Sequence, residues 1–359
     1  MKIGVVVPSL NERDWLVRTI RSIRETTPPG TEIVHVDDAS SPPEPDLSRW
    51  DVRQLRLPER FGAARARAYG MFHLESDWDV AFTCDAHCLY GEGEAVAELL
   101  AEQQKGLNSG ARSPDHRHSE WELAVHMEPN KIERTCKLAL DHHGLSYCGP
   151  ARQGCATVYY QDSGMLRVRF HGVPRRDTDA ESTEPHQHTA GIFGGNYAME
   201  RTAFERMGGY PQLPGHFGFE EEFLSLVACA HKIPIVCASL ISPWHQFRGQ
   251  GWLNKEGRVV DVVHAPYQTT EDMQLLNLAA VYRLCFSERM WQERWRPLLK
   301  TRLLDGRHLT VPERVLRDCE RPEVTAYRDA LQENFVLRDE ELLGELDRRI
   351  ALDNHKEEK

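Results

Sequence analysis

The chain has 359 residues, of which 40% are hydrophobic and 28% are charged, a composition ordinary for a globular protein that holds two half-domains or one domain with an appendage. Its formal net charge of −11 argues against a nucleic-acid partner, because neutralising phosphates requires a clustered excess of lysine and arginine. The opening residues contain too short an apolar run for a signal peptide, and no later stretch approaches the ~20 apolar residues of a membrane span. We therefore expect a soluble, cytoplasmic protein, and the sequence does not predict its oligomeric state.

The first ninety residues alternate between apolar runs and helical patterns. Strands are expected at 3–7, 33–36, 52–57 and 78–85, and helices at 14–26 and 61–72. Near-continuous apolar strands in this β-α-β-α-β order predict a parallel sheet covered by helices on both faces. Ligands of such sheets collect beyond the carboxyl ends of the strands, where the sequence has Asp37, Asp38, Asp85 and His87.

The remainder of the chain divides into an irregular part and a helical part. Residues 105–190 are polar and irregular, which predicts a variable segment or loop with a hairpin around Ala156 to Phe170. From about Thr270 the pattern is helical, most clearly at 271–286 and 325–335, and the last residues are expected to fray.

Several common ligand-binding patterns do not occur in the sequence. No G-x-G-x-x-G follows the first strand and there is no G-x-x-x-x-G-K-S/T, so a Rossmann dinucleotide site and a P-loop both lack their phosphate-binding glycines. The nine cysteines contain no C-x-x-C pair, which predicts free thiols. Cys84 and Cys88 could bind zinc together with His87, but a structural zinc site needs a second spaced pair, and the sequence has none.

The stretch TCDAHC, residues 83–88, places an aspartate and a histidine one residue apart at the end of an expected strand. Side chains at i and i+2 of an extended segment point to the same side, so Asp85 and His87 could both reach one metal ion. The alternative is a strand end whose polar residues face water. The pattern alone does not decide between the two interpretations.

Seven stretches taken in order are more specific than any one of them: VVVPSLNERDWLVRTIRSI, HVDDAS, RFGAARARAYG, DAHC, GIFGGNYAMERTAFERMGGY, HFGFEEEFLSL and PWHQFR. Together they resemble the nucleotide-sugar-dependent glycosyltransferases of the A fold, including family 2-like enzymes. They are most similar to the catalytic domain of polypeptide N-acetylgalactosaminyltransferases, which carries R-x-G-x-x-R-x-R, D-x-H-C and H-V-F-R in this order. The resemblance covers about residues 1–258. It implies an α/β fold with a single Rossmann-like, mostly parallel sheet flanked by helices, followed by a C-terminal helical extension.

The same resemblance implies three units along the chain. Residues 1–100 are expected to form the half that binds the nucleotide-sugar, and residues 101–265 the acceptor-side half that completes the metal and catalytic site. Residues 266–359 are expected to form the helical C-terminal extension.

The resemblance also assigns a divalent metal to Asp85, His87 and His245. A bound metal ion can neutralise the charge that develops on a sugar diphosphate leaving group. An Asp/His/His set suits Mn²⁺ better than Mg²⁺, because imidazole is softer than the oxygen ligands that Mg²⁺ prefers. For His245, the alternative is a histidine that packs beside Trp244.

The nucleotide is expected to bind at the ends of the first strands. Pro8 lies where the first strand presents backbone groups to the base, and either Asp37 or Asp38 can hydrogen-bond uracil or the ribose; the alternative for both is an aspartate that caps its own turn. Arg60 and Arg65 resemble the family arginines beside the base and diphosphate, and their planar donor groups suit carbonyl and phosphate oxygens.

Three further features near these motifs carry predictions. We expect Arg67 to lie on a solvated helix face. Gly194 and Gly195 permit the close backbone approach that a sugar-binding wall requires, although a plain tight turn needs glycine as much. Residues 248–257 have the composition of a loop that orders over a bound diphosphate, with Arg248 in contact with the phosphate.

The acidic run GFEEE supplies the predicted catalytic carboxylates. Glu220 aligns with the family glutamate that holds sugar hydroxyls, and Glu221 lies near the carboxylate that inverting relatives use as a general base. A helix first turn also favours acidic residues because of the helix dipole.

The sequence therefore predicts a metal-dependent hexosyl- or N-acetylhexosaminyl-transferase. The enzyme would move a sugar from a UDP-sugar to the hydroxyl of a small-molecule, glycan or peptide acceptor, with Mn²⁺ or Mg²⁺ and with retention of the anomeric configuration. The alternatives are an inverting enzyme with Glu221 as base, a nucleotidyltransferase, and a non-catalytic sugar-nucleotide-binding module.

Overall fold

The computed structural model describes residues 1–75, 77–91, 131–148, 155–160, 166–171, 187–192, 195–216, 218–237, 244–245, 271–301 and 311–354. Eight strands of these residues form one sheet in the order β3-β2-β1-β4-β10-β6-β11-β9. Their bounds are β1 Ile3–Ser9, β2 Glu32–Asp37, β3 Val52–Arg56, β4 Val80–Cys84, β6 Leu145–Tyr147, β9 Gln187–His188, β10 Asn196–Glu200 and β11 Ile235–Cys237.

The sheet is mostly parallel, as the sequence predicts. β1 runs parallel to β2 and β4, β2 to β3, and β6 to β11, whereas β10 is antiparallel to both β4 and β6 and β9 is antiparallel to β11. Of the parallel strands, β1, β2 and β4 are buried on both faces, which explains their near-continuous apolar sequence, whereas the edge strand β3 is partly exposed.

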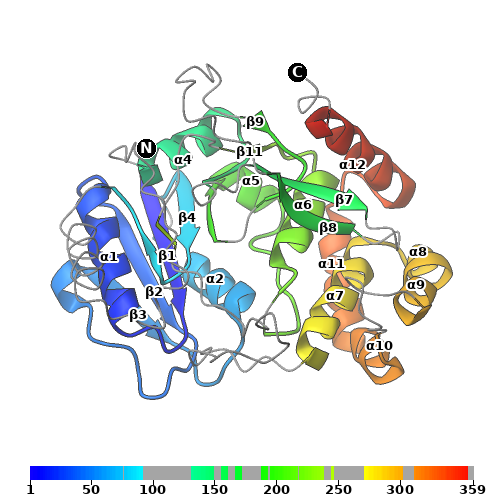
Figure 1. Cartoon of the computed structure of the whole chain (residues 1–359), viewed down its shortest axis with the longest axis horizontal. Helices are drawn as coiled ribbons and strands as arrows, with labels where there is room; N and C mark the ends of the chain where they lie inside the picture. The colour runs from blue at the N-terminus through cyan, green and yellow to red at the C-terminus, as the bar shows by residue number, and fades with distance from the viewer. Residues whose placement is uncertain are drawn as a thin grey trace, which may run out of the picture.

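Helices cover the two faces of this sheet (Figure 1). Along β1, Val5 and Val7 pack with α1 (Asp14–Thr26) and α4 (Lys131–Asp141) in one apolar cluster. Val6, which points to the other side, packs in a second cluster with α2 (Ala63–Phe72) and α6 (Glu220–Ala230). Successive side chains of β1 thus contact helices on opposite faces of the sheet. A short helix, α5 (Arg201–Arg206), follows β10.

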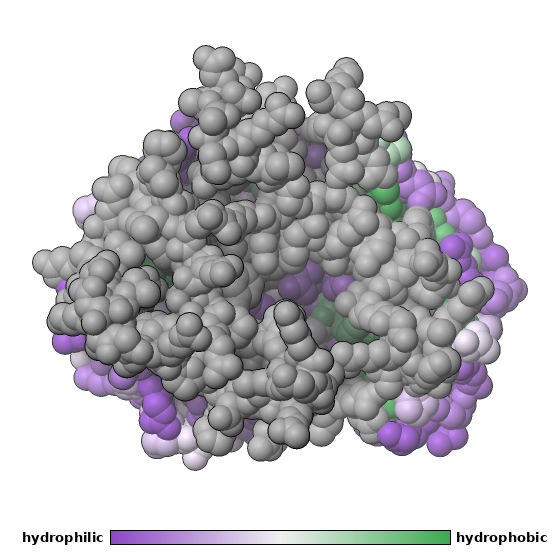
Figure 2. All heavy atoms as spheres, viewed as in Figure 1, coloured by the Kyte–Doolittle hydropathy of each residue, from purple (hydrophilic) through white to green (hydrophobic). Residues whose placement is uncertain are grey.

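The C-terminal helices join the second of these clusters. They are α7 Glu271–Cys285, α8 Glu288–Met290, a π-helical turn Trp291–Trp295, α9 Arg296–Thr301, α10 Glu313–Cys319, α11 Pro322–Glu333 and α12 Asp339–Asn354. Trp291 and Trp295 are fully buried in the cluster that also holds α6. The visible described surface over these helices, on the right of Figure 2, is mainly hydrophilic. The predicted helical extension is therefore confirmed, and it shares a core with the sheet.

Smaller expectations had mixed outcomes. The predicted hairpin is confirmed as β7 (Cys155–Tyr160) and β8 (Leu166–His171), with Ala156 opposite Phe170. The irregular segment predicted at 105–190 was wrong in part, because it contains α4 and the sheet strand β6. The eight cysteines whose side chains the structure describes are free, as expected, and all of them are buried. The domain boundaries near 100 and 265 lie outside the described residues and stay predictions.

Membrane insertion has no support among the described helices. Each of them is too short or too polar to cross a bilayer.

Candidate functional site

The candidate site is built at the carboxyl edge of β1, β2 and β4, where the loops after these strands meet. Pro8 lies in β1 opposite Val36, beyond Val6, the last β1 residue paired with β4. A proline is tolerated there because no β4 carbonyl requires its missing N–H. The main chain continues this edge, since the Asp38 amide donates to the Ser9 carbonyl at 2.9 Å.

Asp37 holds the loop that follows β2. Its carboxylate accepts a 2.7 Å hydrogen bond from the Ser40 amide and a 3.4 Å bond from the Glu44 amide, and it forms an ion pair with Arg56. The first of these bonds is the turn-capping arrangement that the sequence left open as an alternative. Asp37 therefore has a structural role, and contact of its carboxylate with a nucleotide stays a prediction.

Asp38 joins the end of β2 to the loop that precedes α2. Its two carboxylate oxygens accept hydrogen bonds from the amides of Phe61 and Gly62, at 2.7 and 2.8 Å. Burial raises the pKa of Asp38, and the two amide donors oppose that rise. Gly62 has φ 92°, and a Cβ at this position would lie 2.2 Å from the carbonyl oxygen of His216. Only glycine allows this approach of the two loops.

Arg60 and Arg65 flank this loop contact. Arg60 is close enough to Asp38 and His216 to influence both: burial lowers the pKa of His216 and the Arg60 charge lowers it further. Arg65 donates from Nε to the carbonyl of Leu213 at 3.1 Å. The structure thus brings both predicted arginines to the edge where Asp38 lies.

The DAHC turn, residues 85–88, follows β4 directly. The Asp85 amide donates to the carbonyl of Gly195 at 2.9 Å, which brings Gly195 against the turn. One carboxylate oxygen of Asp85 accepts from Arg67 at 2.7 Å, and the other lies 3.9 Å from Nε2 of His87. The aspartate and the histidine therefore approach each other, but through a turn at Ala86–His87 after the end of β4 and not through the extended segment that the sequence analysis assumed.

The expectation for Arg67 was wrong. Its side chain is only 3% exposed, and besides its ion pair with Asp85 its guanidinium lies 5.9 Å from the ring centroid of Tyr197. The reason is its place on α2, where Ala66 and Met71 are also buried. A charged group on such a face requires a partner, and Asp85 provides it.

Glu12 is a site residue that the sequence reasoning missed. Its side chain is 1% exposed, and Oε1 lies 3.3 Å from Nδ1 of His87. The loop that carries it is fixed by Glu44, whose carboxylate accepts hydrogen bonds from the amides of Glu12 and Arg13 at 2.7 and 2.8 Å. A carboxylate on Nδ1 fixes the imidazole tautomer and leaves Nε2, on the Asp85 side, as an electron-pair donor.

Glu220 and Glu221 lie in the first turn of α6, which begins after Phe219 in a left-handed conformation with φ 67°. Burial raises the pKa of Glu220 to about 8; Arg67 lowers it, and Glu221 and Asp85 raise it further. One oxygen, Oε1, is buried without a hydrogen-bond partner among the described residues. Glu221 is only partly buried. Glu220 therefore belongs to the Asp85 cluster, and nothing here assigns a role to Glu221.

The third predicted metal ligand is brought to the DAHC turn by its backbone. In β12 (Trp244–His245), His245 pairs antiparallel with Cys88 of β5 (Cys88–Leu89), one residue after His87. The side chain of His245 lies outside the described residues, as do Gly194, Arg248 and the proposed 248–257 loop. Among the described side chains, no group of three or more His, Cys, Asp or Glu could hold a metal. The donor set nevertheless fits a metal, because Asp85 and an oriented His87 Nε2 face each other.

Comparison with known proteins identifies the family. Residues 4–208, more than half of the chain, match the family model described as Glycosyl transferase family 2. The chain belongs to this family. The matched region of this glycosyltransferase runs from β1 to the turn after α5 and includes the DAHC turn. No curated protein matches the sequence.

A solved structure shows the same fold in this family 2 glycosyltransferase. A crystal structure of GalNAc-T7 with UDP, GalNAc and Mn²⁺ matches 99% of this chain and 57% of its own, with a TM-score of 0.56 and 17% identity. A crystal structure of S. aureus TarS matches 93% of this chain and 52% of its own, with a TM-score of 0.43 and 12% identity. This chain thus spans a little more than half of the GalNAc-T7 chain. The fold is the A fold of glycosyltransferases.

Proposed function

We propose that this glycosyltransferase moves a sugar from a UDP-sugar to an acceptor hydroxyl and uses a divalent metal, Mn²⁺ or Mg²⁺. The observation that carries the proposal is the arrangement of Glu12, His87 and Asp85, in which a carboxylate orients the imidazole toward the second carboxylate. The similarity in fold to a GalNAc-T7 structure that contains UDP and Mn²⁺ supports the choice of donor and metal. The acceptor and the sugar are not part of the proposal.

The proposed metal ligands are Asp85, His87 and His245. When bound, a divalent cation would neutralise the charge on the departing diphosphate. Arg67 then keeps one oxygen of Asp85 engaged at 2.7 Å, which orients the carboxylate so that its other oxygen faces His87. The buried Glu12 holds the imidazole in place from the opposite side.

The proposed nucleotide contacts lie at the neighbouring strand ends. Pro8 and the main chain after β1 would face the base, and Asp38 or Asp37 would accept from uracil or the ribose. Arg60 and Arg65 would donate to the base carbonyls and the diphosphate. Gly195, against Asp85, would form part of the wall beside the sugar, with Gly194 and Arg248 completing it.

The two glutamates would have different tasks. Glu220 lies near Asp85, and burial raises the pKa of its carboxyl group, which suits a group that holds a sugar hydroxyl. We propose retention, as the resemblance to the retaining N-acetylgalactosaminyltransferases implies, with the leaving diphosphate helping to deprotonate the acceptor. The alternative is inversion with Glu221 as base.

The function is tested by incubating the protein with UDP-sugars and measuring release of UDP. We expect UDP release in the presence of Mn²⁺ and its loss after EDTA treatment. Hydrolysis or transfer that EDTA leaves undiminished contradicts the metal proposal. Binding of UDP-sugars without any turnover would indicate a non-catalytic module, and release of pyrophosphate from a nucleotide triphosphate would indicate a nucleotidyltransferase.

The anomeric outcome is tested separately. With an α-linked UDP-sugar, proton NMR of the product should show the small coupling of an α-glycoside. Glu221→Gln should lose less than about tenfold in turnover, whereas removing a general base costs about 10²–10⁴-fold. A β-linked product together with an inactive Glu221→Gln protein would reverse the assignment and make Glu221 the base.

The orienting role of Glu12 gives a third prediction. Glu12→Gln removes the negative charge beside Nδ1 of His87 while keeping the side-chain shape. We expect Mn²⁺ affinity to fall about 10- to 100-fold, measured as the Mn²⁺ concentration dependence of UDP release and as direct Mn²⁺ binding by electron paramagnetic resonance. Glu25→Gln, a matched charge change on α1 away from the site, should leave both unchanged. Equal Mn²⁺ affinities of Glu12→Gln and wild type would exclude this role.

A further inference from the structure

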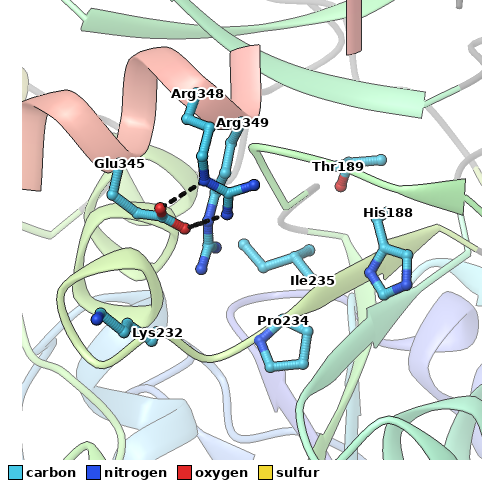
Figure 3. Close-up of a pocket in the computed structure, with 8 residues that line it drawn as sticks. All are labelled: His188, Thr189, Lys232, Pro234, Ile235, Glu345, Arg348 and Arg349. Atoms are coloured by element: carbon cyan, nitrogen blue, oxygen red, sulfur yellow. Dashed lines mark hydrogen bonds and ion pairs between the residues drawn. The ribbon is translucent and has the colours of Figure 1, made fainter. Parts of the chain in front are cut away.

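A cavity of about 480 Å³ lies between the end of the sheet and α12 (Figure 3). Its lining comes from three places: β9 and β11 at the end of the sheet, the turn between α6 and β11, and the middle of α12. This volume is within the range of small-molecule sites in proteins.

The cavity is separate from the proposed donor site. The strand register links Ile235 of β11, across β6, β10 and β4, to Gly4 at the start of β1. The donor site instead lies at the other end of β1, after Ser9, which is five residues or about 16 Å further along the strand. The cavity is also four strands away across the sheet, about 19 Å at the usual strand spacing. A ligand in one site therefore does not touch the other.

Arg348 and Arg349 of α12 line this cavity, and hydrogen bonds to Glu345 hold both side chains in place. Glu345 accepts from Nε and Nη2 of Arg348 at 2.8 and 2.7 Å, and from Nε of Arg349 at 3.0 Å. Nη1 of Arg349 also donates to the carbonyl of Ile233 at 3.1 Å. The hydrogen bonds from Arg348 above all lower the pKa of Glu345 to about 2, so this carboxylate is ionised at neutral pH. The three side chains therefore carry a net charge of +1.

Donor capacity remains after these contacts. In the described part of the chain, nothing pairs with Nη1 of Arg348, with Nη2 of Arg349 or with Nζ of Lys232. The side chain of Arg348 is 60% exposed and that of Arg349 is 11% exposed, so one guanidinium is open to solvent and the other is held in the wall. Planar guanidinium groups with free N–H donors are suited to phosphate oxygens.

Lys232 adds the second net positive charge. It occupies the turn after α6 with φ 54°, a left-handed conformation that normally favours glycine. A non-glycine residue there costs about 1 kcal/mol or more, and the exposed lysine at this position lines the cavity from the α6 side. With the α12 cluster, the lining reaches +2 in a chain whose formal net charge is −11. His188 and Thr189 supply further polar groups on the sheet side.

We propose that this cavity binds a small soluble ligand through a phosphate or diphosphate group, at a second site distinct from the donor site. Arg348, Arg349 and Lys232 are the groups that recognise it. The sheet-edge residues Pro234 and Ile235 give the ligand an apolar floor, which a phosphate ester can cover with its organic part. This inference does not depend on the sugar donor or on the metal.

The proposal is tested by calorimetric titration with inorganic pyrophosphate in the presence of EDTA, which keeps metal out of the donor site. We expect binding to the wild-type protein and a Kd at least about tenfold weaker in Lys232→Gln/Arg348→Gln, because two charge-assisted donors are lost. The control Arg314→Gln/Arg317→Gln makes the same charge change on α10 and should bind like wild type.

A second measurement locates the ligand. Pyrophosphate should slow acetylation of Lys232 by an amine-reactive reagent, detected by mass spectrometry, and should not protect Lys137, an exposed lysine on α4. Failure of the wild-type protein to bind pyrophosphate overturns the proposal. The proposal is also overturned if Lys232→Gln/Arg348→Gln still binds pyrophosphate and Arg60→Gln does not. The ligand would then occupy the donor site.

Discussion

Replacing Asp85 by asparagine is expected to reduce sugar transfer at least about 10²-fold and to abolish the Mn²⁺-dependent rise in thermal stability caused by UDP. The physical reason is the loss of a carboxylate ligand, since a metal that stabilises a leaving group contributes several kcal/mol to the barrier. Ligand binding to the native state raises apparent stability by mass action, so a thermal shift with UDP and Mn²⁺ reports the site even without turnover.

His245→Ala provides the companion variant. Its backbone is paired with Cys88, next to His87, and its loss should produce the same phenotype without disturbing the Arg67 ion pair. Asp46→Asn, which removes a carboxylate on an exposed loop, serves as the matched control and should behave like wild type. If both Asp85→Asn and His245→Ala keep the Mn²⁺-dependent shift with UDP, the proposed ligand set is incorrect.

The parallel part of the fold could be predicted because its signals are local. Apolar runs in β1, β2 and β4 and the apolar face of α1 are visible within windows of a few residues, and the elements lie where they were expected. The direction of β10 could not be predicted in this way. It depends on pairing with β4 and β6, strands that lie far from it along the chain. The helix α4 was missed although its apolar residues follow a helical pattern comparable to that of α1, so a local signal was present.

The sequence predicted the site residues that belong to a recognisable motif. It missed those whose role depends on their burial in the folded protein. Asp85 and His87 belong to one short motif, and the turn that follows β4 brings their side chains within 3.9 Å of each other. The alternating arginines and alanines before Arg67 give no amphipathic pattern, so no local signal marks which arginine is buried. Its burial follows from Asp85, eighteen residues later, which supplies the opposite charge.

Glu12 was missed for a related reason. A glutamate in a polar loop after the first strand has no sequence signal for burial, and its role follows from contact with His87, seventy-five residues away. The available signal was positional: Glu12 follows β1 at the same carboxyl edge of the sheet that carries Asp38 and Asp85. Acidic residues after other strands of such a sheet should therefore be tested as orienting groups for histidine ligands.

The buried ion pair itself leads to the largest expected effect on stability. Arg67→Met removes a cation that is 3% exposed and leaves the Asp85 carboxylate near Glu220 without compensation. We expect the free energy of unfolding to fall by about 2–3 kcal/mol, less than the cost of breaking a fully buried pair, because Asp85 is 26% exposed. Urea denaturation followed by circular dichroism measures this change. Arg65→Met, on the same helix, loses a single hydrogen bond to the Leu213 carbonyl and should cost only about 1 kcal/mol.

A double variant separates charge compensation from simple packing at this site. If Arg67 is needed because Asp85 is charged, Arg67→Met combined with Asp85→Asn should be more stable than the sum of the single effects predicts, since no uncompensated charge remains. A coupling of about 1–3 kcal/mol is expected for two residues in contact at 2.7 Å. Additive effects, or an Arg67→Met protein within about 1 kcal/mol of wild type, would mean that Arg67 contributes through its hydrocarbon contacts and that Asp85 is solvated in the free enzyme.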